Sequence, residues 1–153
     1  MAVNLVHVAR ARASRMARPQ RDQIMTPLRD ALAALRRGVA TEFEWAQAVT
    51  AVNLGDAIES QGVVRGLGGH FKLIDLALLE IGKRARSVGS WRPPALYYEE
   101  RDLLDMLVDL HGHQVRSLSF GELSRARDKA IVQTRSAPGG RVIDVDHQQG
   151  VLA

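Results

Sequence analysis

Residues 41–62, TEFEWAQAVTAVNLGDAIESQG, predict the helix around which the rest of the chain is arranged. Thr41 and Glu44 form the pattern of a capping box, in which each side chain accepts a hydrogen bond from a backbone N–H at the helix start. Gly62 suits the left-handed conformation that closes many helices. We therefore expect a single helix whose two ends are determined by local interactions.

This helix is apolar on two sides, and such a helix normally packs between other elements. Steps of about 100° per residue divide its side chains into two stripes and a narrow strip left for water. The first stripe contains Trp45, Val49, Val52, Asn53 and Asp56; the second contains Phe43, Leu54 and Ile58; the strip contains Glu44, Gly55 and Glu59. The two polar members of the first stripe must be hydrogen-bonded if they are buried, and we interpret them as a contact that specifies the fold.

Capping and periodicity predict four further helices, near residues 26–37, 70–88, 95–115 and 119–133. Thr26 before Pro27 marks the start of the first of them. Ser119 with Glu122 is a second capping box and opens the last. The predicted fold is all-α, a compact bundle of about five helices at residues 23–134. A basic arm precedes it at 1–22, and an irregular tail follows at 135–153.

The composition is that of a globular protein, with 46% hydrophobic and 25% charged residues in a chain of 153. The absence of cysteine excludes disulfides, thiolate metal sites and cysteine nucleophiles. No apolar run approaches the ~18 residues that span a bilayer. We expect a cytoplasmic protein that does not enter membranes.

Positive charge is concentrated at the start of the chain, where residues 1–37 hold eight arginines and two acids. Arginine-rich segments bind nucleic-acid phosphates, although a solubilising role is the simpler interpretation. The last predicted helix adds a second basic group, interrupted by Asp128. The candidate nucleic-acid-binding residues are Arg10, Arg12, Arg15, Arg18, Arg21, Arg125, Arg127 and Lys129.

The helix near residues 95–115 carries an acidic face opposite its leucines, formed by Asp102, Asp105, Asp109 and His113. A row of acids is usually a solvated helix face, and no second cluster supplies the further ligands that a metal needs. His111 falls on the apolar face, where a buried histidine with one hydrogen bond is the ordinary outcome. We find no nucleophile–base or metalloprotease motif, so we expect a protein that is not an enzyme and uses no cofactor.

A spaced set of residues resembles a family of small helical proteins of bacterial phages and plasmids. The set covers about residues 28–118 and departs at Gly112, where an acidic residue is more usual. It comprises Leu32, Leu35, Arg36, Gly38, Ala40, Thr41, Trp45, Asn53, Gly89, Ser90, Trp91, Asp109, Leu110, His111 and Gln114. The resemblance implies a mobile-element setting, and it assigns no site residue. Small non-enzymatic proteins of such elements often act stoichiometrically on host machinery, anti-CRISPR proteins among them.

Two hypotheses follow. The first is a phage or plasmid protein that binds and inhibits a host defence ribonucleoprotein complex or one of its subunits, with the acidic face imitating nucleic acid. The second is a nucleic-acid-binding regulator or accessory factor that uses the arm and the last helix. A homodimer formed through apolar positions such as Leu76 and Leu79 is compatible with either.

Overall fold

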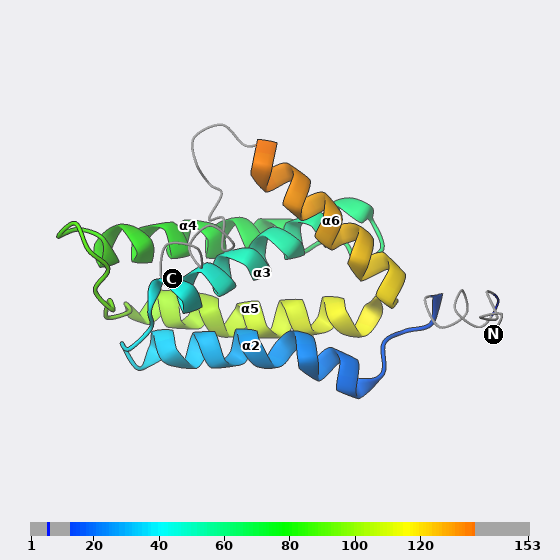
Figure 1. Ribbon diagram of the computed structural model, residues 1–153, viewed down its shortest axis with the longest axis horizontal. Helices are drawn as coiled ribbons and strands as arrows, with labels where there is room; N and C mark the ends of the chain where they lie inside the picture. Colours follow the sequence, from blue (N-terminus) through cyan, green and yellow to red (C-terminus); the bar gives the residue numbers. More distant parts are fainter. Residues whose placement is uncertain (1–5, 7–12, 137–153) are drawn as a thin grey trace, which may run out of the picture.

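The structure, a computed structural model, describes residue 6 and residues 13–136, and its described part is all-α (Figure 1). The only extended pairing among these residues is an isolated bridge between Arg15 and Ser119. The helices are α2 (Arg18–Arg36), α3 (Glu42–Gln61), α4 (Gly68–Ala85), α5 (Tyr98–Ser117) and α6 (Phe120–Ser136). The predicted bundle of about five helices is confirmed.

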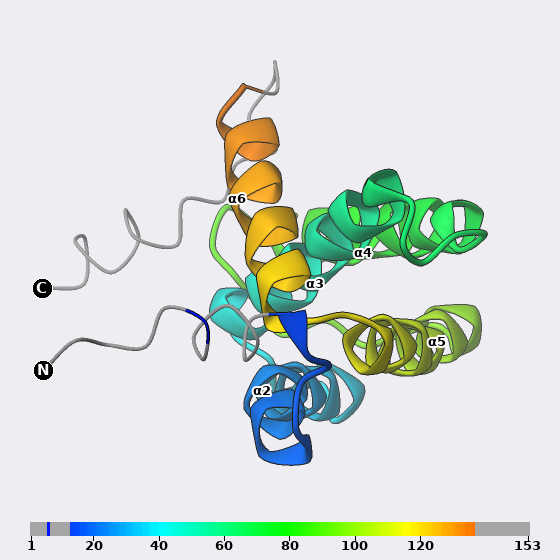
Figure 2. The same cartoon turned by 90° about the vertical axis from the view of Figure 1, so that its right-hand side faces the viewer.

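Helix α3 is the centre of the bundle, as predicted, and contacts each of the other four helices. Helices α2 to α5 run roughly alongside one another, whereas α6 crosses α3 at a steep angle (Figures 1 and 2). The capping box at the start of α3 is confirmed, with the N–H of Thr41 donating to the Glu44 carboxylate at 2.8 Å. Gly62 ends the helix in the left-handed conformation, at φ 80°.

The start predicted for α2 at Thr26 is wrong, because the helix begins at Arg18 and contains Pro27. Two features hold the extra turns. The N–H of Ala17 donates to the Gln20 side chain at 3.0 Å, which caps the helix start. Met25, on one of these turns, is buried in the core. Tertiary burial therefore outweighs the backbone hydrogen bond that a proline removes.

The strip of α3 assigned to water is displaced from its predicted position. Gly55 is buried, and a Cβ built on it would lie 2.5 Å from the ring of Phe71 on α4. The buried polar contact expected at Asn53 and Asp56 is also wrong, since Asn53 is half-buried and Asp56 is exposed. The helix is therefore rotated relative to the expectation, with a glycine turned towards the α4 ring.

At each end of the contact between α3 and α4, an aromatic side chain of one helix packs against a glycine of the other. Phe71 of α4 lies on Gly55 of α3, and Trp45 of α3 lies on Gly82 of α4, where a Cβ would be 2.7 Å from the indole. The Trp45 Nε1 also donates to the carbonyl of Leu78 at 2.8 Å. Because neither glycine carries a side chain, the two backbones approach closely enough to bury both aromatic rings.

The segment between α4 and α5 returns to the bundle through Trp91. Its Nε1 donates to the carbonyl of Ala40 at 2.9 Å, and its ring lies 5.7 Å from that of Trp45. The capping box at Ser119 and Glu122 is confirmed by reciprocal hydrogen bonds of 3.0 and 3.2 Å. Ile131 on α6 is exposed.

Candidate functional site

An open groove of about 680 Å³ lies between α2, α3 and α6. We refer to it as the groove throughout. Most of its lining is apolar, with a few uncharged polar side chains and one arginine. The lining residues are Met16, Gln20, Gln23, Ile24, Pro27, Leu28, Phe43, Gln47, Thr50, Ala51, Leu54, His111, Phe120, Leu123 and Arg127.

The second apolar stripe of α3 explains why the groove exists. Phe43, Gln47, Thr50 and Leu54 recur at helical spacing and therefore share the face of α3 that lines it. Helix α6 contacts the last turn of α3. There Gln61 donates to the carbonyl of Glu122 at 2.9 Å, and Lys129 donates to the Ser60 hydroxyl at 2.8 Å. On this face, Phe43 in the first turn of α3 stays exposed.

Two phenylalanines remain exposed where the groove is open. Phe43, at the start of α3, is 46% exposed, and Phe120, at the start of α6, is 42% exposed. Both belong to the lining, with Ile24 of α2 half-buried beside them. Exposed aromatic side chains gathered in a concave apolar surface are characteristic of a binding site rather than of the general surface.

Among the residues that the structure describes, Arg127 is the only ionisable group of the groove lining apart from His111, so this part of the lining carries little charge. Two of the polar lining groups already form hydrogen bonds within the protein. The Gln20 side chain accepts from the N–H of Ala17, and the Thr50 hydroxyl donates to the carbonyl of Ala46 at 2.9 Å. The groove therefore offers a ligand mainly apolar contact and one positive charge.

His111 is buried beneath the groove and confirms the prediction of a core histidine. Gln114, also buried, donates its Nε2 to the carbonyl of Gly55 at 3.0 Å and directs its Oε1 to the His111 Nδ1 at 3.2 Å. The Nδ1 must therefore carry a proton and donate a hydrogen bond to the Gln114 oxygen. Burial lowers the pKa of His111, and the hydrogen bond to Gln114 opposes this shift in part. The imidazole is neutral at pH 7 and helps to join α5 to α3.

The predicted acidic face of α5 is exposed, but it is interleaved with arginines of α2. Arg36 forms an ion pair with Asp105, and Arg29 lines the same shallow depression as Asp105 and Asp109. Asp102 and His113 are exposed on the same helix. The four residues share one face of α5, yet a cation lies at its centre, so they do not form the continuous negative surface that imitation of nucleic acid requires.

The predicted basic residues are partly brought together. The bridge between Arg15 and Ser119 places the N-terminal segment against the start of α6, which carries Arg125 and Arg127 as exposed side chains. Lys129 is exposed and hydrogen-bonded to Ser60. Arg18 pairs with Asp22 at 3.9 Å, and Arg18 and Arg21 both lie on α2. Arg10 and Arg12 lie outside the described residues.

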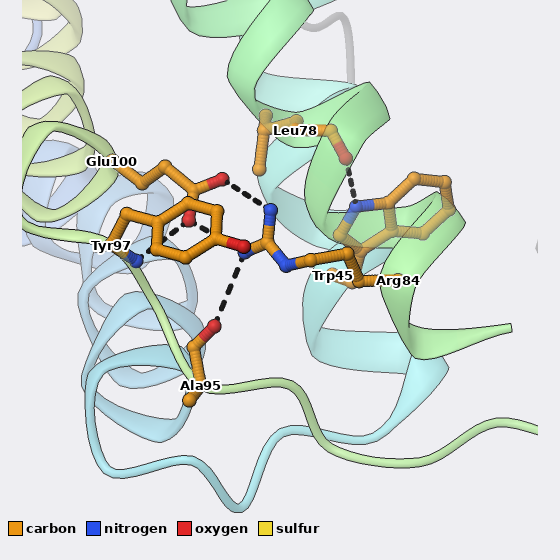
Figure 3. Close-up of polar contacts among 6 residues, drawn as sticks. All are labelled: Trp45, Leu78, Arg84, Ala95, Tyr97 and Glu100. Atoms are coloured by element: carbon orange, nitrogen blue, oxygen red, sulfur yellow. Dashed lines mark hydrogen bonds and ion pairs between the residues drawn. The ribbon is translucent and has the colours of Figure 1, made fainter. Parts of the chain in front are cut away.

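Sequence reasoning missed an ion pair that joins α4 to α5. The Arg84 guanidinium donates to both carboxylate oxygens of Glu100, at 2.6 and 2.9 Å, and to the carbonyl of Ala95 at 3.2 Å (Figure 3). The same guanidinium lies 4.3 Å from the centre of the Tyr97 ring, and the N–H of Tyr97 donates to Glu100 at 2.8 Å. These groups bind one another, and we therefore assign the cluster a structural role.

Within the part of the chain that the structure describes, no three potential metal ligands lie close enough together to hold an ion. Likewise, none of the described helices has the length and apolar character needed to cross a membrane. Comparisons of the chain with protein-family models, with curated proteins and with solved structures find no match. The groove is therefore the feature on which a functional proposal can rest.

Proposed function

We propose that this protein acts by binding another protein in the groove, and that its partner is a subunit of a host defence complex that it inhibits stoichiometrically. The groove carries the first half of the proposal. Two half-exposed phenylalanines, an apolar lining and a single arginine are the composition of a protein-recognition surface, in which aromatic and arginine side chains dominate the binding energy.

The second half of the proposal, the identity of the partner, rests on the resemblance of residues 28–118 to small proteins of phages and plasmids. An inhibitor of this kind is an anti-CRISPR-like protein. It needs a rigid binding surface and no catalytic group. The arginines of α2 that lie among the acids of α5 make the groove, rather than imitation of nucleic acid, the better-supported means of binding.

A plaque assay tests both halves together. Cells with CRISPR–Cas immunity are challenged with a targeted phage while they express the wild type, Phe43→Ser or Leu73→Ser. Leu73, on α4, is 54% exposed and lies outside the groove, so it matches Phe43 in exposure. We expect the wild type and Leu73→Ser to restore plating and to co-purify with a defence subunit in nuclease-treated lysate, and Phe43→Ser to do neither.

The plaque assay can contradict the proposal in two ways. No protection by the wild type against any defence system tested would contradict the inhibitor. Equal protection by both variants would contradict the groove as the binding surface.

The bridge between Arg15 and Ser119 favours a second candidate function, binding to nucleic acid by a regulator or accessory factor. It brings a cation of the N-terminal segment to the helix that carries Arg125 and Arg127. Such binding to duplex DNA would weaken steeply with salt. Replacing these three arginines by glutamine is expected to lower the slope of log affinity against log salt by about 3. An unchanged slope would exclude this surface.

A further inference from the structure

We infer that the groove accepts a helical segment of the partner, with apolar side chains on one face and a carboxylate that meets Arg127. This inference rests on the proposed function and names the chemistry of the partner. Three observations carry it: the backbone of the groove walls, the spacing of the groove-lining positions on α3, and the distribution of charge.

The walls of the groove favour a helix over an extended peptide. They are formed chiefly by α2, α3 and α6, whose backbone N–H and C=O groups are largely used within the helices themselves. An extended segment would bring its own backbone groups against these three helices, which offer it no strand edge, and buried unpaired groups of this kind are costly. A helix satisfies its backbone internally and presents only side chains.

The positions on α3 that line the groove have the spacing that a packed helix requires. Phe43, Gln47, Thr50 and Leu54 are separated by four, three and four residues and so form one row along the groove. Helix α6 already packs across the last turns of this face. A partner helix on the first turns would continue the same packing, with apolar side chains at i, i+3 or i+4, and i+7.

The charge of the groove specifies the polar contact. Within the described part of the chain, no carboxylate lines the groove, and Arg127 is exposed and has no ion pair. The neighbouring Asp128 lines a different depression, together with Arg125. A carboxylate on the partner would complement the single cation, whereas a second cation would be repelled.

Fluorescence anisotropy with designed peptides tests the inference on the full chain. The probes are labelled amphipathic helices of about four turns, with leucines on one face and one glutamate, whose position differs from peptide to peptide. A parallel set carries lysine in place of glutamate. The protein variants are Arg127→Glu and, as a matched control on the same helix, Arg125→Glu, which reverses a charge outside the groove.

We expect at least one glutamate peptide to bind the wild type and Arg125→Glu equally. Arg127→Glu should weaken this binding by about tenfold and should favour the corresponding lysine peptide. Equal binding of glutamate and lysine peptides, or equal effects of the two variants, would overturn the inference. So would an absence of peptide binding. Protection of phage that depends on Phe43 would in each case leave the proposed function standing.

A photo-crosslinking amino acid at Gln47 identifies competing occupants of the groove in the full chain. Cross-links confined to residues 137–153 of the same molecule, or to a second copy, would overturn the inference, because the groove would then be filled by this protein itself. Cross-links to the bound glutamate peptide, competed by unlabelled peptide, are the expected result.

Discussion

The two apolar sides of α3 are closed to very different degrees. On the side that faces α4 and α5, Phe71 lies against Gly55, and Gln114 bonds the Gly55 carbonyl, with every one of these groups buried. On the side that faces α2 and α6, the groove stays open, and Phe43 is half-exposed in it. An apolar stripe on a helix thus indicates contact, but the contact can be with the protein's own core or with another molecule.

Among the substitutions considered, removal of the Phe71 ring should lower the free energy of unfolding most. The side chain is fully buried, and Phe71→Ala is expected to lower the free energy of unfolding by about 3–5 kcal/mol. Urea denaturation followed by circular dichroism measures the change. Phe71→Leu, which retains more of the volume, should lose less. A loss below about 1 kcal/mol for the alanine variant would show that the closed side is not tightly packed.

A methyl group added at Gly55 should disturb the packing of α3 against the Phe71 ring of α4. Gly55→Ala is expected to destabilise by about 1 kcal/mol, because overpacking costs about 1–3 kcal/mol and the gain in helix propensity returns about 1 kcal/mol. Gly69→Ala is the matched control, since a Cβ on this glycine of α4 meets nothing within 4 Å. It should stabilise the protein by up to about 1 kcal/mol. Equal effects of the two substitutions would contradict the close approach at Gly55.

Acid should weaken the closed side through His111. Because burial lowers the pKa of this residue below its ordinary value of 6.5, the unfolded chain binds its proton more tightly than the folded protein does. The free energy of unfolding should therefore fall as pH decreases from about 7 to about 5. The slope should flatten in His111→Gln and persist in His113→Gln, which alters an exposed histidine of the same helix. A slope that is identical in all three proteins would exclude His111 as its source.

Substitution in the groove should have the smallest effect on stability. Phe43→Ser removes a half-exposed side chain, and we expect a loss of less than about 1 kcal/mol, similar to that of Leu73→Ser. The two variants should differ in partner binding alone. If Phe43→Ser were as destabilising as Phe71→Ala, the open side of α3 would belong to the core, and the loss of binding could not be assigned to the groove.

The ends of the central helices could be determined from the sequence because they depend on neighbouring residues. The capping boxes at Thr41 and Ser119 and the left-handed Gly62 each involve residues close together in the sequence. Their patterns can therefore be recognised without knowledge of the fold. The start of α2 could not be found in this way. Its extra turns depend in part on the burial of Met25, against which the local signals at Thr26 and Pro27 are weak.

The residues of the groove could be predicted from the sequence only in part. The sequence showed that α3 has a second apolar stripe, and it located the cations of α6 that include Arg127. It could not show that Phe43 would stay exposed, because that depends on where α6 crosses α3. Nor could it pair Arg84 with Glu100, or Arg36 with Asp105, since each pair joins different helices.

Signals between neighbouring residues therefore account for the all-α class, the central position of α3 and the ends of helices that carry local caps. Which face of α3 is closed depends instead on contacts between helices. Gly55 meets Phe71 of α4 and Gln114 of α5, and such long-range contacts set the rotation of the helix and leave the groove open on its other side. Periodicity reports that a face is apolar, whereas the volume and position of distant side chains decide what covers it.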